Sequence, residues 1–376
     1  MDESEYNHVE NLPENIMIEL LSYLSVIELI RAQRVCKRWK RLAKDQMLWR
    51  NVNLTSCKRV SVRFLWFLLR RCLGPGLRSL RLRGFLLSAR KGTLLSESWL
   101  KALCAKCPRL SKLHLLHVDL RSLVTIRVLP QTLQELELRE CELPPDFFSQ
   151  AAEAGSHQGE HGSRSYIIIE RLVVNTVPSF TDHHLQSLTS WEKLSRLELR
   201  DTFRVTVKGL RDCAAKTGIN GVEGLSHLKF LEIGSLGRQV QMASLALGVG
   251  WPGLEELSLG GKEVGPGLLT TNRLKDLKRL RLWACRLSEH QVVRSCRTLR
   301  GLRQMEFVDV VFLSPWGPVG AEREGGEEEE AADSDGSGDE NKKRDAIICS
   351  VRHILGELLP SCTLAFTNCS AQINTD

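Results

Sequence analysis

Aromatic side chains are scarce in this sequence: they make up 6% of 376 residues, and only three are tyrosines. Long hydrophobic runs are absent too, because the longest apolar run covers only residues 64–69, far short of the roughly 20 residues that cross a bilayer. Residues 1–5 are acidic and lack the basic and apolar regions of a secretory leader. We therefore expect neither a membrane protein nor a secreted one.

Cysteine is too sparse for a disulfide scaffold, with twelve residues in the whole chain. This favours reduced thiols and a cytoplasmic or nuclear location. A CxxC motif contains Cys104 and Cys107, but neither a second pair nor a histidine cluster lies at zinc-site spacing. We expect both thiols to fill a structural role and the chain to bind no metal.

Motifs of enzyme chemistry are also missing. Residues 260–262 lack the upstream glycine and the following serine or threonine of a phosphate-binding loop. The sequence contains no Gly-x-Ser-x-Gly elbow and no assembly of acid, base and nucleophile. We predict that the protein is no enzyme and needs no cofactor.

The net charge of +7 is unevenly distributed. Residues 322–340 contain ten acidic residues and one arginine, so the rest of the chain carries a net charge of +16. This basic character suits nucleic acid, an acidic protein partner or solubility alone, and composition does not choose among them.

The first 50 residues predict a compact helical head. Ile16, Leu20 and Leu24 recur at helical spacing, with Met17 and Leu21 beside them. The segment 25–28 has the pattern of a capping box, so a second helix should start there. A head of about 40 residues with so much apolar surface should pack against something else.

From residue 77 onward a leucine pattern recurs: apolar, two variable, apolar, one variable, apolar. Its nine copies start at residues 77, 110, 133, 169, 194, 228, 254, 277 and 302, and a degenerate copy starts at 359. The spacing is close to that of leucine-rich repeats. Each repeat should supply a short strand and a helix, with Cys141 and Cys285 at a small buried position after the strand.

The predicted fold is therefore α/β: a helical head and then a solenoid, a horseshoe of parallel strands and helices. We expect the head at 9–52, a linker and N-terminal cap at 53–76, and repeats over 77–376. Loop insertions should interrupt the repeats at about 153–165 and at 315–344, where Gly, Ser and acidic residues gather.

Within each strand, the residues between the leucines should lie on the concave face. Most of this face should be a mixed, solvated surface. Arginine and tryptophan are common interface anchors, and the expected substrate-binding residues are of these two types: Arg81, Arg83, Arg139, Arg200, Arg281 and Trp283. Glutamates occupy other positions of the same concave face. They favour a charged protein segment as the ligand over a phosphate backbone, which they would repel.

The head resembles the F-box motif over residues 9–52, because a Leu-Pro pair, a Val-Cys-x-x-Trp segment and a Leu-Trp-Arg segment occur at the spacing of that family. The resemblance implies a signature made by Leu12, Pro13, Ile16, Leu20, Leu24, Val35, Cys36, Trp39, Leu48 and Trp49. The resemblance implies that residues of this signature either bind a Skp-family adaptor or fill the core, and the sequence does not separate these roles.

An F-box followed by leucine-rich repeats is the arrangement of F-box/LRR proteins. That resemblance implies a substrate-recognition subunit of an SCF (Skp–cullin–F-box) ubiquitin ligase, which reaches cullin through the adaptor and holds a protein substrate for degradation. Two alternatives remain: an F-box scaffold that acts outside a ligase, and a nucleic-acid-binding repeat protein. The acidic residues on the concave face argue against nucleic-acid binding.

Overall fold

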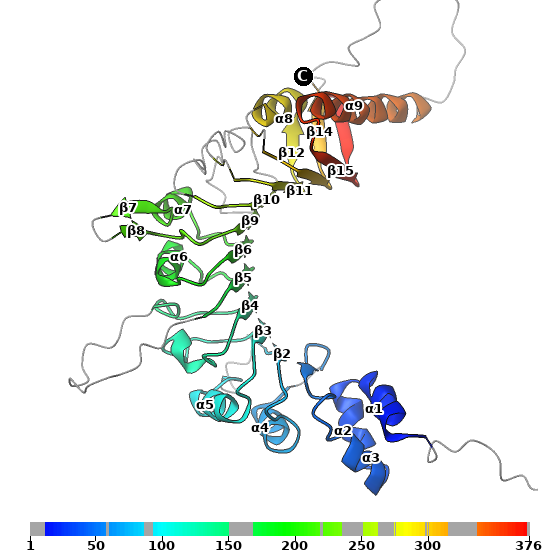
Figure 1. Ribbon diagram of the computed structural model, residues 1–376, viewed down its shortest axis with the longest axis vertical. Helices are drawn as coiled ribbons and strands as arrows, with labels where there is room; N and C mark the ends of the chain where they lie inside the picture. Colours follow the sequence, from blue (N-terminus) through cyan, green and yellow to red (C-terminus); the bar gives the residue numbers. More distant parts are fainter. Residues whose placement is uncertain are drawn as a thin grey trace, which may run out of the picture. The chain divides into compact units, whose positions relative to one another are not determined.

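The computed structural model describes residues 12–57, 60–85, 93–149, 168–218, 221–234, 251–261, 274, 276–297, 299, 301–314 and 337–373. The chain forms two compact units, Met1–Ser179 and Phe180–Asp376. Figure 1 labels many of their helices and strands. The insertion expected at 153–165 lies outside the described residues.

Three short helices open the N-terminal unit: α1 (Glu14–Ser22), α2 (Val26–Ala32) and α3 (Lys37–Leu42). The predicted capping box at the start of α2 is confirmed. The Glu28 N–H donates to the Ser25 hydroxyl (3.4 Å), and the Ser25 N–H donates to the Glu28 carboxylate (2.8 Å). These bonds satisfy N–H groups that a helix start leaves without partners.

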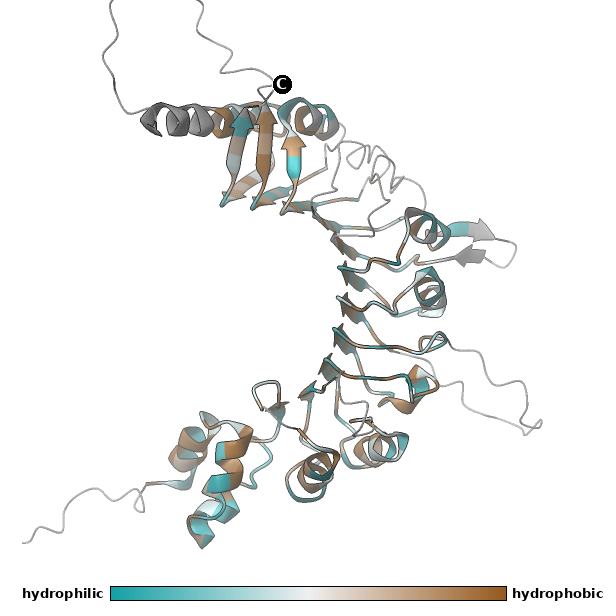
Figure 2. Cartoon of the chain, turned by 180° about the vertical axis from the view of Figure 1, so that it is seen from behind, coloured by the Kyte–Doolittle hydropathy of each residue, from teal (hydrophilic) through white to brown (hydrophobic). Residues whose placement is uncertain are grey.

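The core of this head lies between the helices and the segment that follows them. Its buried side chains include Met17, Leu21, Leu29, Leu42 and Trp49. The Trp49 indole N–H donates to the Ala43 carbonyl at 2.8 Å, so burying the ring leaves no polar group unpaired. Each helix presents polar residues as well as apolar ones (Figure 2).

The described part of the N-terminal unit contains five parallel strands: β1 (Asn51–Asn53), which precedes the repeats, and the repeat strands β2 (Ser79–Arg83), β3 (Lys112–Leu116), β4 (Glu135–Arg139) and β5 (Arg171–Asn175). Neighbouring strands pair in phase, so that Leu80, Leu113, Leu136 and Leu172 form one row across the sheet. All four side chains are at most 1% exposed, and their burial is the main stabilising term of the array.

The connections between these strands are less regular than the strands. Helices α4 (Val62–Arg71) and α5 (Glu97–Lys106) precede β2 and β3, each capped by a serine hydroxyl at its start. Between β3 and β4 the chain forms only the 3₁₀ helix η2 (Ile126–Val128). The expectation of a helix in each repeat is therefore wrong here, because the shorter spacing leaves room for one tight turn.

The C-terminal unit continues the same repeat with six parallel strands: β6 (Arg196–Arg200), β9 (Phe230–Gly234), β10 (Glu256–Gly260), β11 (Arg279–Trp283), β13 (Gln304–Val308) and β15 (Thr363–Thr367). Its other elements are α6 (Asp182–Ser187), η3 (Leu188–Ser190), α7 (Val207–Asp212), α8 (Glu289–Cys296), α9 (Ser337–Leu358) and the hairpin β7 (Lys216–Gly218) and β8 (Gly221–Glu223). A second parallel sheet consists of β12 (Arg286–Ser288), β14 (Val311–Ser314) and β16 (Ser370–Ile373).

The residue after most strands has a left-handed backbone. His117, Glu140, Thr176, Asp201, Ala284, Asp309 and Asn368 have φ between 48° and 54°, and each directly follows a repeat strand. The next residue enters the core, and the predicted burial of Cys141 and Cys285 at this position is confirmed, at 0% and 2% exposure. A left-handed residue turns the chain sharply, which lets a small side chain point inward directly after the strand.

The insertion expected at 315–344 ends earlier than predicted, because residues 337–344 belong to α9. Glutamate, lysine and arginine, which have high helix propensity, occur in this segment of the sequence and favour a helix there. The remainder of that insertion lies outside the described residues. Within the described part of the chain, no helix combines the length and apolar character needed to cross a membrane.

Candidate binding surfaces

Helix α1 carries two neighbouring apolar faces. Met17 and Leu21 are 1% and 2% exposed and fill the head's core. Ile16 and Leu20, one residue earlier at the same spacing, are 38% and 49% exposed. The described chain therefore leaves the second face uncovered, and we define Ile16 and Leu20 as the apolar patch of the head. Val35, which precedes α3, is a further exposed apolar residue, at 64%.

The other predicted F-box residues differ in exposure. Pro13 and Cys36 are exposed, Leu12, Leu24, Trp39 and Leu48 are half-buried, and Trp49 is buried. The Arg38 guanidinium donates to the Leu12 carbonyl and Arg41 forms an ion pair with Glu14, so α3 holds the start of α1 in place.

The sequence pattern did not identify two further exposed apolar residues of the head. Tyr23 is 80% exposed and Met47 is 72% exposed. Tyr23 continues the spacing of Ile16 and Leu20 by three residues, which could have identified it. Met47 has no such periodic signal, because it lies in a turn between α3 and β1.

In each unit, the repeat strands bury their leucines on one side. We call the opposite side of these strands the open face of that unit. It comprises the first, third and fifth residues of each five-residue strand, since side chains alternate along a strand. Arg81, Arg83 and Arg139 lie on the open face of the N-terminal unit, whereas Arg200, Arg281 and Trp283 lie on that of the C-terminal unit. The predicted substrate-binding residues thus form two groups, one on each unit.

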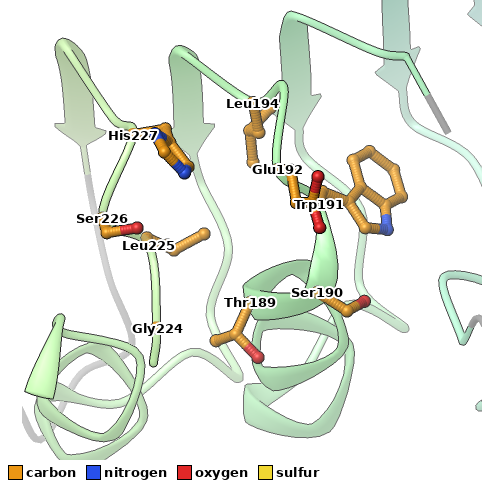
Figure 3. A pocket seen from close by; sticks show the side chains of 9 residues that line it. All are labelled: Thr189, Ser190, Trp191, Glu192, Leu194, Gly224, Leu225, Ser226 and His227. Carbon is orange, nitrogen blue, oxygen red and sulfur yellow. The ribbon is translucent and has the colours of Figure 1, made fainter. Parts of the chain in front are cut away.

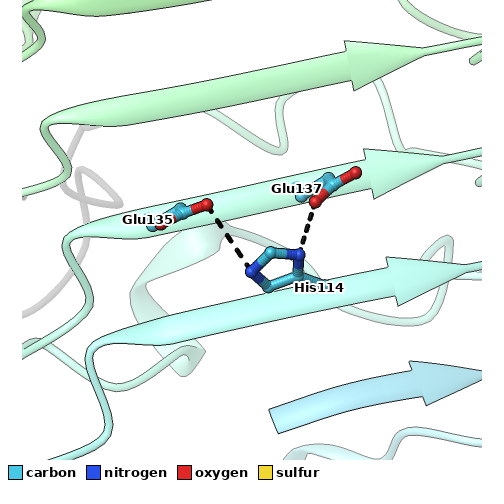
Figure 4. A group of neighbouring side chains, drawn as sticks. All are labelled: His114, Glu135 and Glu137. Carbon is cyan, nitrogen blue, oxygen red and sulfur yellow. Dashed lines mark ion pairs between the residues drawn. The ribbon is translucent and has the colours of Figure 1, made fainter. Parts of the chain in front are cut away.

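An ion-pair network occupies the centre of the N-terminal open face (Figure 4). Glu135 contacts Lys112 Nζ and Arg171 Nη1, both at 2.9 Å, and His114 Nε2 at 3.6 Å. Glu137 is paired with His114 Nδ1 and with Arg139. The two glutamate side chains are only 10% and 12% exposed, whereas those of Lys112 and Arg139 are 55% and 50% exposed.

These contacts keep both carboxylates ionised. Burial opposes ionisation of Glu137, but the His114 hydrogen bond and the charges of His114 and Arg139 outweigh it and lower its pKa to about 2. Glu135 is also partly desolvated, and the contact with Lys112 and the charges of Arg171, Lys112 and His114 lower its pKa below the ordinary range. Both glutamates are therefore fixed negative charges beneath a layer of cations.

His114, Glu135 and Glu137 also place ligand atoms within 4.8 Å of one another, a spacing that a metal ion could bridge. Lys112, Arg139 and Arg171 contact the same two carboxylates, however. A divalent ion would have to displace or approach these cations, so the residues do not fit a metal site.

The C-terminal open face repeats this arrangement of buried glutamates beneath arginines. Glu198 accepts from Arg196 Nε at 2.8 Å and from Arg200 Nη2 at 3.2 Å, and Arg200 also pairs with Glu232. The two glutamate side chains are 3% and 5% exposed. Arg196 additionally lies 3.4 Å from the ring centroid of Phe230, a cation–π contact on the neighbouring strand.

Trp283 lies flat on two glycines of this face. Gly234, Gly260 and Trp283 share one register row on β9, β10 and β11. A Cβ atom at Gly260 would be 2.1 Å from the indole, and one at Gly234 would be 2.6 Å from it. Only glycine leaves space for the ring, so the tryptophan forms part of the surface and does not project from it.

A hollow of about 580 Å³ lies in the C-terminal unit, between the loops that precede β6 and β9 (Figure 3). Glu192, His227, Leu194 and Leu225 contribute to its wall, while the indole of Trp191 points away from it. It lies where the strands begin, away from the open face.

The environments of the cysteine thiols indicate a structural role. All twelve cysteines are free, and burial raises the pKa of Cys107 to about 11 and of Cys141 to about 12. Such thiols remain protonated at neutral pH and are poor nucleophiles. His184 Nδ1 accepts from the Thr181 N–H at 3.2 Å at the start of α6.

Comparison with known proteins finds one family model and several relatives that match this chain. The F-box-like family model matches residues 9–55. F-box/LRR-repeat protein 12 of Homo sapiens is 35% identical over 301 residues, which cover 78% of this chain and 86% of the relative. The Bos taurus protein of that name is 34% identical over 302 residues, covering 79% and 87%. An internalin structure from Listeria monocytogenes covers 65% of this chain and 64% of its own, at 15% identity and a TM-score of 0.30.

Proposed function

This chain belongs to the F-box/LRR-repeat protein family, and we propose that it is a substrate-recognition subunit of an SCF ubiquitin ligase. The head would bind a Skp-family adaptor and, through it, cullin. The repeats would bind a protein substrate destined for the proteasome, in the cytoplasm or the nucleus.

The apolar patch of the head is the observation that carries this proposal. Ile16 and Leu20 lie four residues apart on one face of α1 and keep much of their surface in water, although Met17 and Leu21 already complete the core. Exposing such groups together is unfavourable unless a partner covers them. Family membership indicates which partner: F-box proteins generally act in SCF complexes.

The protein would promote ubiquitin transfer by position alone. An adaptor-bound head and a substrate-bound sheet raise the effective concentration of a substrate lysine near the conjugating enzyme. Bond formation would take place on the conjugating enzyme and the substrate, so the receptor would need neither a nucleophile nor a cofactor.

Substitutions on α1 test the adaptor contact. We expect the double variant Ile16→Asp, Leu20→Asp to lose at least about tenfold in affinity for a purified Skp-family adaptor, because two carboxylates would enter an apolar interface. Replacing Leu12 and Pro13 together with alanine should also weaken binding. Isothermal titration calorimetry with the full chain would measure both affinities.

Glu19→Gln is the matched control, since Glu19 is an exposed residue of the same helix outside the apolar patch. Its affinity should equal that of the wild type, and the circular dichroism and melting temperature of each variant should be unchanged. Wild-type affinity in the aspartate double variant, with the fold intact, would refute the proposed adaptor surface.

A further inference from the structure

The open faces of the two units differ in their balance of charge. On the N-terminal unit, strands β2 to β5 present five side chains with fixed positive charge and two carboxylates: Arg81, Arg83, Lys112, Arg139, Arg171, Glu135 and Glu137. On the C-terminal unit the repeat strands present four of each: Arg196, Arg200, Arg279, Arg281, Glu198, Glu232, Glu256 and Glu306. Only the N-terminal face has an excess of cations.

Both carboxylates of the N-terminal face are already neutralised. Lys112 and Arg171 contact Glu135, and Arg139 and His114 contact Glu137. The glutamates lie beneath their partners, while Arg139 and Lys112 keep about half of their side-chain surface in solvent. An arginine has five N–H donors, so Arg139 retains donors for a ligand.

Arg81 and Arg83 have no counter-ion among the described residues, and both are exposed. They stand two residues apart on β2 and on the same side of the sheet, hence about 7 Å apart. Guanidinium groups stay charged at any physiological pH and bind carboxylates in a bidentate manner. Two such groups in water beside a neutralised network form a surface for anions.

We propose that the open face of the N-terminal unit binds an acidic, extended segment of a protein substrate, with Arg81 and Arg83 as the principal contacts and Arg139 as a further one. This assignment rests on the proposed function, because it specifies the class of substrate. The five cations span four strands, about 15 Å, which suits several carboxylates along a chain better than one isolated anion.

The same face is poorly suited to nucleic acid. Its twelve open-face positions on β2 to β5 include no phenylalanine, tyrosine or tryptophan, so bases would find no side chain of these types on which to stack.

Peptide binding to the full chain tests this proposal. The probe is a fluorescein-labelled peptide of alternating glutamate and glycine. At about twelve residues, or about 40 Å when extended, it is more than long enough to cross the four strands. Its uncharged counterpart is the same peptide with glutamine for glutamate. Fluorescence anisotropy should show the acidic peptide binding at least about tenfold more tightly, with an affinity that falls as salt rises from about 50 to about 200 mM.

The double variant Arg81→Gln, Arg83→Gln should lose about tenfold or more in this affinity. Arg279→Gln is the matched control, because Arg279 is an exposed arginine on the open face of the C-terminal unit, paired with Glu256 at 2.9 Å. This control should bind the acidic peptide like the wild type.

Equal binding by the double variant and the wild type would overturn the proposal, as would equal losses in the double variant and the control. Tighter binding of single-stranded DNA than of the acidic peptide would also overturn it. Adaptor affinity, measured on the same samples, separates the two proposals. Peptide binding without adaptor binding would reject the ligase role alone, and adaptor binding without peptide binding would reject this inference alone.

Discussion

At the scale of single residues, the position two places after each strand shows how strictly the repeat selects its side chains. Val118, Cys141, Val177 and Val310 occupy this buried position with apolar groups or a thiol. Thr202 occupies the equivalent position after β6 and is 0% exposed, and its hydroxyl has no hydrogen-bond partner among the described residues. A buried hydroxyl without a partner lowers stability, because it has lost its bonds to water.

Thr202→Val should therefore stabilise the protein by about 1–2 kcal/mol, since valine has nearly the same shape without the hydroxyl. Urea unfolding of the full chain measures the change in the free energy of unfolding. The reverse change at the equivalent site, Val177→Thr, should destabilise the protein by a similar amount. A loss of stability in Thr202→Val would show that the hydroxyl has a partner in solution.

At the scale of elements, the paired strands β3 and β4 make part of the stability depend on pH. Glu137 on β4 has a pKa of about 2 in the folded protein, below its ordinary value of 4.5, through its contacts with His114 on β3 and Arg139. A depressed carboxyl pKa stabilises the fold above the unfolded value, and this contribution disappears as the pH falls from about 4.5 to about 2.

Glu137→Gln should reduce stability near neutral pH by up to about 3 kcal/mol and should leave stability near pH 2 almost unchanged. Comparing urea midpoints of variant and wild type across this range isolates the effect from other carboxyl groups. Glu192→Gln, at an exposed position, serves as control and should follow the wild-type curve. A destabilisation of Glu137→Gln that is the same at both pH values would contradict the account.

The elements also show how far the sequence could predict the structure. The strands were predicted well, because every repeat buries three apolar residues at fixed spacing. In one repeat these are Leu110, Leu113 and Leu115. The connections were not, because the backbone after a strand is set by a left-handed residue such as Thr176 or Ala284, types that carry no turn signal.

The candidate site was predicted in part, for similar reasons. Apolar periodicity located α1, but Ile16 and Met17 both fit a helical stripe, and only the packing of the head separates the exposed face from the buried one. On the open face, the alternation of side chains identified Arg81 and Arg83. Among the described residues these two arginines have no counter-ion, because the strand register places no glutamate beside them on β3.

At the scale of the whole molecule, the chain combines two chemically different surfaces that need not interfere. The head has an apolar patch at residues 16 and 20, and the N-terminal open face has an excess of arginine and lysine. An apolar surface is covered by a partner with little dependence on salt, whereas an exposed cationic surface depends strongly on it. A receptor that must hold an adaptor and a substrate at the same time benefits when the two partners bind through different kinds of interaction.

The most direct test of the proposed ligase role is sedimentation velocity of the full chain with a purified Skp-family adaptor and cullin. The account predicts one faster-sedimenting species that contains all three proteins in equal amounts, and its loss in the Ile16→Asp, Leu20→Asp variant. A complex of the chain with adaptor that excludes cullin would contradict the ligase role and indicate a scaffold, and sedimentation of the chain alone would contradict adaptor binding itself.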